Sequence, residues 1–255
     1  MKARPPMLRH LFVAALACGL TATAACGEFV INPLRVTLDR NAKSSEIVVR
    51  NDDTAPLRMQ VEGMSWTQDA DGRDQYAPAE GLVFFPRAME LAPGESRVVR
   101  VGVRAAPVTR EETYRLFMEE LPGPPDASAR PADGATLRVY LRVGVGVFVA
   151  PAQPERAAAI TKFALSGGKA DITVANTGNV HIRAEQFELV GTDARGERVL
   201  VQPVQERYVL AGVTKTMAVP IPPDVCRQLV TLEAVVVGER LDLKRKLDVA
   251  PGNCS

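Results

Sequence analysis

One stretch of the chain, residues 136–149, alternates apolar side chains with polar or small ones for longer than an ordinary strand requires. Period two places every odd-numbered side chain on the same face. At about 3.3 Å per residue, such a strand reaches roughly 45 Å, more than twice the usual strand length. We therefore expect a sheet protein that presents part of this strand to another molecule, which favours a partner-binding protein over an enzyme. The apolar positions are Leu137, Val139, Leu141, Val143, Val145, Val147 and Val149.

The first 26 residues have the layout of a secretory signal peptide, which predicts export. A basic start precedes a short apolar stretch at residues 11–20, and small residues follow it. We expect cleavage between Ala24 and Gly27. The apolar stretch is too short for a permanent membrane helix, and no later run is long enough for one.

The charge and cysteine content of the remaining chain narrow its partners and its compartment. Without the three basic residues of the leader, 28 of the 31 basic residues remain against 30 acidic ones, which does not suggest nucleic acid or a membrane surface as a partner. Cys226 and Cys254 remain as a pair after the leader, and an exported chain predicts a disulfide between them, with two buried thiols as the alternative.

Short strand-like runs separated by Gly, Pro, Asn and Asp predict an all-β protein built of antiparallel sandwiches. A proline-containing linker near residues 150–155 divides it into an N-terminal domain at 27–150 and a C-terminal β-sandwich domain at 156–255. The loop at 122–135 carries four prolines and is predicted to be mobile. The expected strands are 29–38, 45–50, 57–66, 82–85, 88–91, 96–103, 113–121, 136–149, 160–165, 170–176, 182–190, 199–204, 207–210, 214–219, 230–237 and 241–249.

The sequence offers no catalytic motif, and we predict neither a catalytic residue, a metal site nor a cofactor. His181 is the only histidine after the leader and is interpreted as a structural or surface residue. The pair Glu119 and Glu120 would point to opposite faces of a strand and cannot easily cooperate as acid and base. An enzyme that uses two facing carboxylates, such as a glycosidase, stays open as a distant alternative.

Four stretches of the first domain carry a resemblance to a known family. They are Asn32-Pro33-Leu34-Arg35-Val36-Thr37-Leu38, then Ile47-Val48-Val49-Arg50-Asn51, then Pro86-Arg87 through Leu91-Ala92-Pro93-Gly94-Glu95 to Val99-Arg100, and last Thr113-Tyr114-Arg115-Leu116-Phe117. Together they resemble the periplasmic pilus (fimbrial) chaperones. The second domain is similar chiefly through Asn176-Thr177-Gly178-Asn179 and the cysteine pair.

The resemblance implies two immunoglobulin-like sandwiches set at an angle, and a chaperone that lends an edge strand to pilus subunits, which lack one strand. The donor residues implied are Leu137, Val139 and Leu141, with Val143 next. Val145, Val147 and Val149 are expected in the chaperone's own core. The implied partners are pilus subunits and an outer-membrane usher, and the implied compartment is the periplasm. A self-capping dimer of free chaperone is left open.

Family members hold the carboxylate at the subunit's C-terminus with basic residues in the cleft between the domains. Arg35 matches the first of these positions, but the position of the usual lysine falls on Gly146, so Arg115 becomes the expected second anchor. The run from Val143 to Pro151 is similar to the archaic branch of the family. The main alternative to a chaperone is an exported structural or adhesive β-sandwich protein with lipid on Cys26.

Overall fold

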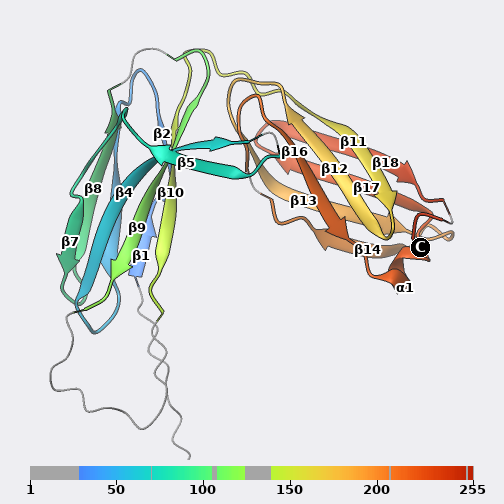
Figure 1. The fold of residues 1–255 in the computed structure, drawn as a ribbon, viewed down its shortest axis with the longest axis horizontal. Helices are drawn as coiled ribbons and strands as arrows, with labels where there is room; N and C mark the ends of the chain where they lie inside the picture. The colour runs from blue at the N-terminus through green and yellow to red at the C-terminus, as the bar shows by residue number, and fades with distance from the viewer. Residues whose placement is uncertain are drawn as a thin grey trace, which may run out of the picture.

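The computed structural model describes residues 29–69, 71–104, 108–123, 139–206, 208–250 and 252–254. The leader assigned to residues 1–26, the donor candidate Leu137 and most of the loop at 122–135 lie outside the described residues. The described chain is built almost entirely of strands, which form two β-sandwiches that meet at an angle (Figure 1). The predicted fold class, two immunoglobulin-like sandwiches, is confirmed.

The first sandwich consists of two sheets whose inward side chains form one apolar core. One sheet has the order β1-β3-β8-β6, and the other has the order β2-β10-β9-β4-β5, with β7 added beside β4. The strands are β1 (Phe29–Asn32), β2 (Arg35–Leu38), β3 (Ser44–Asn51), β4 (Leu57–Gln68), β5 (Asp74–Pro78), β6 (Leu82–Phe85), β7 (Ala88–Leu91), β8 (Ser96–Val103), β9 (Glu112–Leu121) and β10 (Arg142–Val149).

The predicted strand at residues 29–38 is two strands that belong to different sheets. β1 pairs with β3, whereas β2 runs parallel to β10. Pro33 stands between the two strands, and a proline cannot donate a hydrogen bond to either ladder, so the chain leaves the first sheet at this point. This switch places Arg35 beside β10.

The long alternating stretch forms a shorter strand than predicted, because β10 begins only at Arg142. Val145, Val147 and Val149 are buried in the core, as expected. Phe148, on the opposite face of the same strand, is also fully buried, since that face meets the second domain.

The second sandwich pairs a sheet of order β11-β12-β16 with a sheet of order β14-β13-β17-β18, and β15 adds to β13. Its strands follow the predicted ones closely, and a short helix, α1 (Pro223–Cys226), was not predicted. The strands are β11 (Ala158–Ser166), β12 (Lys169–Asn176), β13 (Ile182–Thr192), β14 (Arg198–Pro203), β15 (Tyr208–Val209), β16 (Thr214–Pro220), β17 (Thr231–Gly238) and β18 (Leu241–Asp248).

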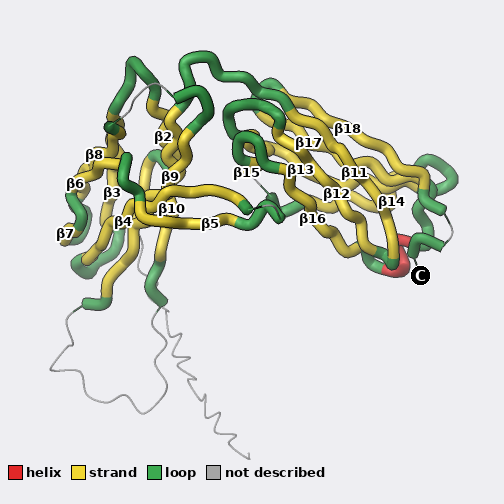
Figure 2. Tube along the Cα trace, turned by 45° about the horizontal axis from the view of Figure 1, so that its top comes forward, coloured by secondary structure: helices red, strands yellow, loops and turns green. Residues whose placement is uncertain are grey.

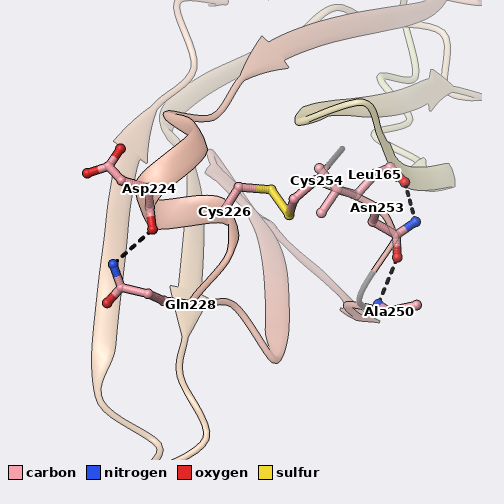
Figure 3. The surroundings of a disulfide bond; sticks show 7 residues. All are labelled: Leu165, Asp224, Cys226, Gln228, Ala250, Asn253 and Cys254. Carbon is pink, nitrogen blue, oxygen red and sulfur yellow. Dashed lines mark hydrogen bonds between the residues drawn. A yellow bond between two sulfur atoms is a disulfide. The ribbon is translucent and has the colours of Figure 1, made fainter.

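The predicted disulfide between Cys226 and Cys254 is present and ties α1 to the end of the chain (Figure 3). Beside it, the Asn253 side chain donates a hydrogen bond to the Leu165 carbonyl at 2.7 Å and accepts one from the Ala250 amide at 2.7 Å. The bond closes a loop with a sequence separation of 28 residues. Such a closure stabilises a fold by about 3–4 kcal/mol in the chain-entropy model.

Both sandwiches use one buried asparagine to fasten the turn that follows an equivalent strand. Asn51 ends β3 and Asn176 ends β12, and both are at most 2% exposed. The Asn51 amide donates to two main-chain carbonyls, and the Asn176 amide donates to three. Because buried polar groups require partners, these bonds fix the turns in both domains.

Candidate binding edge and interdomain cleft

β10 has one paired edge and one edge that is only half covered. β9 pairs with all of Arg142–Val149, but β2 covers the other side only from Gly146 to Val149. Within the described ranges, residues 142–145 have no strand on that second side. We call residues 139–145, on the side of the strand that β2 does not cover, the open edge.

The direction of the main-chain groups along the open edge follows from the bonds on either side. The Glu120 amide donates to the Leu141 carbonyl at 2.9 Å, so the main-chain N–H and C=O groups of the odd-numbered residues face β9. The Gly146 amide donates to the Leu34 carbonyl at 3.1 Å, so the main-chain groups of the even-numbered residues face the opposite side. An antiparallel ladder alternates in this way. The N–H and C=O groups of Arg142 and Gly144 therefore point to the open edge, where an incoming strand would pair with them.

The apolar side chains of the same stretch pass from the core to the surface. Val145 is fully buried, Val143 is partly buried against the core, and Leu141 and Val139 are 38% and 57% exposed. All four lie on one face, because they alternate along the chain. The apolar face of the sandwich thus continues past the last core residue, Val145, through three predicted donor residues, of which Leu141 and Val139 are exposed.

Arg35 and Arg115 lie on either side of Gly146, one in each neighbouring strand. Gly146 is the register partner of Arg35 in β2 and of Arg115 in β9. Lateral partners in a sheet share a face, so both arginine side chains rise from the face of Gly146. The structure therefore brings together the two predicted anchor residues at the position where the family's lysine is missing.

The Arg115 side chain reaches β10 at Gly144, and a second glycine, Gly146, lies against the Phe148 ring. The Arg115 Nη1 reaches the Gly144 carbonyl at 3.4 Å. A Cβ at Gly144 would approach Phe117 to 3.2 Å and the Arg115 Cδ to 3.7 Å, and one at Gly146 would approach the Phe148 ring to 2.8 Å. A side chain at Gly146 would require this ring to move.

Among the described residues, the Arg115 guanidinium is held by aromatic rings rather than by a carboxylate. It stacks on the Trp66 ring at 3.8 Å and lies 5.6 Å from the Tyr208 ring, which belongs to the second domain. Its Nε is buried and has no hydrogen-bond partner in the described part of the chain. Stacking orients the planar fork while its N–H groups remain ready for an anion.

These residues line a cleft of about 780 Å³ between the two domains. The cleft contains three arginines, Arg35, Arg115 and Arg183, and two carboxylates, Asp74 and Glu206. Each carboxylate is already engaged: Asp74 accepts bonds from Gln68 and Tyr76, and Glu206 forms an ion pair with Lys215 at 2.6 Å. The cleft therefore carries surplus positive charge, which favours an anionic ligand.

The cleft keeps its shape because the domains are joined by buried contacts. The Glu111 carboxylate, 3% exposed, accepts bonds from the His181 amide and from its Nδ1, both at 2.8 Å. The His181 ring stacks on Phe148 at 3.9 Å. His181 is thus structural, as one of the two sequence interpretations had it.

A hairpin of β4 and β5 adds a second connection between the domains. Figure 2 shows β5 extended from the first sandwich toward the strands β15 and β16. Gln68, at the end of β4, donates to the Tyr208 carbonyl at 3.2 Å and accepts from the Leu210 amide at 2.9 Å. Pairing of this kind resembles one rung of a sheet and holds β15 against the first domain.

Within the described ranges, no three histidine, cysteine, aspartate or glutamate side chains are placed to hold a metal ion. Burial raises the pKa of the Tyr76 hydroxyl, and the negative charge of Asp74 raises it further. This hydroxyl therefore stays protonated at neutral pH and donates to Asp74.

No described helix is long and apolar enough to cross a membrane.

Residues 28–155, half of the chain, match the family described as "Pili and flagellar-assembly chaperone, PapD N-terminal domain". The chain belongs to this family. The resemblance inferred from the sequence is therefore confirmed, and the matched segment contains both anchor candidates and the whole open edge. No curated protein sequence matches the chain.

Solved structures with the same fold include other pilus chaperones. One is the CsuC–CsuE chaperone–tip adhesion subunit complex of archaic Csu pili from Acinetobacter baumannii, with 16% identity, a TM-score of 0.57, and coverage of 85% of this chain and 98% of that chain. Another is the E. coli chaperone DraB, with 17% identity, a TM-score of 0.53, and coverage of 88% and 98%. A third is the Salmonella enterica SafA pilin in complex with the SafB chaperone, with 14% identity, a TM-score of 0.55, and coverage of 87% and 97%. At these identities the likeness establishes the fold, and assignment to the archaic branch stays a prediction.

Proposed function

We propose that this pilus chaperone acts in the periplasm, where it binds pilus subunits by donor-strand complementation and delivers them to an outer-membrane usher. The observation that carries the proposal is the open edge, which combines main-chain groups that no described strand pairs with and exposed apolar side chains. A subunit that lacks one strand offers the complementary surface, a groove with unpaired main-chain groups and apolar pockets. The pairing needs no catalytic residue or cofactor.

The direction of the captured strand follows from the position of β2. β2 runs parallel to β10 and occupies the side of Gly146–Val149, so the captured strand would occupy the same side over residues 139–145. If its carboxyl end meets Arg35, where β2 begins, it must run parallel to β10. Its terminal carboxylate then lies between Arg35 and the Arg115 guanidinium, and bidentate bonds from arginine would fix the register of the pair.

The side chains along this strand would complete the subunit's core. Leu141 and Val139 would enter its pockets, with Val143 at the boundary between the two cores, and Leu137, outside the described residues, would be the next in the series. Full burial of one such side chain contributes about 1.5–3 kcal/mol. Transfer to the usher requires no chemical step, because one strand replaces another.

In a free chaperone, the open edge can pair with the open edge of a second copy of the chain. A self-capping dimer is therefore part of the proposal.

Co-expression with an exported pilus subunit encoded beside this chain tests the proposal. We expect an affinity-tagged subunit to recover the chaperone from the periplasm in equal amounts. The matched control is the same subunit with a donor strand fused to its own end, which fills the groove and should recover no chaperone. Equal recovery by both forms would contradict strand capture, because binding would then not depend on the empty groove.

A further inference from the structure

The second domain supplies an arginine to the cleft that sequence analysis did not identify. Arg183 belongs to β13, and it lines the cleft together with Arg35 and Arg115. Arg183 and Arg35 also line a smaller adjoining recess, with Arg156 and His181. The cleft and the recess therefore share Arg35 from the first domain and Arg183 from the second.

The charge of Arg183 is only loosely compensated. Its nearest described carboxylate is Glu185, at 3.9 Å, and the two side chains are 36% and 58% exposed. A long, exposed ion pair of this kind contributes about 0–1 kcal/mol, and it can exchange for a stronger partner at little cost. In the part of the chain that the structure describes, Arg35 has no ion pair, and Arg115 interacts with aromatic rings, the Tyr76 hydroxyl and the Gly144 carbonyl but with no carboxylate in an ion pair.

We propose that Arg183 is the third anchor of the terminal carboxylate and that the site is complete only when both domains contribute to it. This inference rests on the proposed function, since it concerns the same captured strand. A carboxylate has two oxygens with about four acceptor positions, so a third arginine can donate to it when Arg115 binds in bidentate fashion and Arg35 through a single N–H group. Arg35 and Arg115 hold it from the first domain, and Arg183 closes the site from the second.

The contacts between the domains give this arrangement its geometry. Arg183 is the register partner of Tyr208, whose ring lies 5.6 Å from the Arg115 guanidinium. Gln68 binds the main chain on both sides of Val209, and so holds β15 in place. The second-domain arginine is therefore positioned through β15 relative to the first-domain pair.

The test uses the single tryptophan of the chain, Trp66, which lies directly under Arg115. Its fluorescence is recorded while the leaderless protein is titrated, at low salt, with a short peptide of alternating valine and threonine. One form of the peptide ends in a free carboxylate and the other in an amide, and lysines at the amino end keep both soluble. The ratio of the two affinities measures recognition of the carboxylate alone.

We expect the wild-type protein to prefer the carboxylate form, and Arg183→Gln to reduce this preference by about tenfold without changing affinity for the amide form. Arg198→Gln is the matched control, because Arg198 is an exposed arginine of the second domain that does not line the cleft. An unchanged preference in Arg183→Gln would overturn the role of Arg183 and leave the proposed function intact. Failure of the wild-type protein to distinguish the two peptides would overturn the carboxylate anchor itself.

Discussion

Val139→Asp is expected to lower the affinity for a pilus subunit by roughly a hundredfold while the melting temperature of the free chaperone stays unchanged. Val139 is 57% exposed in the free protein, so an aspartate there remains in water. In the complex the same side chain would enter an apolar pocket, where the valine contact is lost and an unpaired carboxylate is buried. The effect falls on the complex because only the complex buries this position.

Two substitutions of the same kind define what the Val139 result means. Val201 has the same exposed fraction, 57%, but lies on β14 of the second domain, so Val201→Asp should leave both capture and stability unchanged. Val147 is fully buried, so Val147→Asp should unfold the first domain. Melting curves and pull-down yields for the three variants separate the cases. Equal loss of fold and capture in Val139→Asp would assign this valine to the chaperone's own core.

Arg115→Ala is expected to reduce recovery of a subunit complex by on the order of a hundredfold, because it removes the bidentate hydrogen bonds to the terminal carboxylate of the subunit. Arg35→Ala should have an effect in the same direction from the other side of Gly146. Neither arginine has a carboxylate partner among the described residues, so their loss leaves no buried charge without a counterion. We therefore expect both variants to fold.

The control for the arginine variants is Arg100→Ala, on β8 in the sheet of the same domain that does not contain β10. Arg100 is 77% exposed and forms an ion pair with Glu46, so its loss should change neither stability nor capture. Recovery is measured after co-expression with the same subunit, and circular dichroism checks the fold. Normal recovery from both Arg115→Ala and Arg35→Ala would remove the anchor from the account.

The sequence predicted the strands better than it predicted where their surfaces are covered. The alternation at residues 136–149 correctly gave the side chains that share a face, because this depends only on period two. It did not reveal where burial ends between Val145 and Val139, because that depends on the point where β2 stops covering β10. The strand β5 was missed because all five of its residues are exposed and no alternation marks it.

The cleft was the least predictable part of the molecule. Arg35 and Arg115 were identified through family resemblance, whereas Trp66, Arg183 and Tyr208 carry no local signal. Their positions come from different strands and both domains, so only the interdomain contacts bring them together. A polar residue such as Gln68 at a strand end gives no sign that its partner lies 140 residues further along the chain.

The most direct test of strand lending is hydrogen exchange at individual amides of β10, with and without a bound subunit. In the free protein, the Arg142 and Gly144 amides face the open edge and should exchange rapidly, whereas the Gly146 amide, bonded to Leu34, should be protected throughout. On subunit binding, Arg142 and Gly144 should become as protected as Gly146. Amides at these two positions that are already protected in the monomer, or that stay unprotected in the complex, would contradict the account.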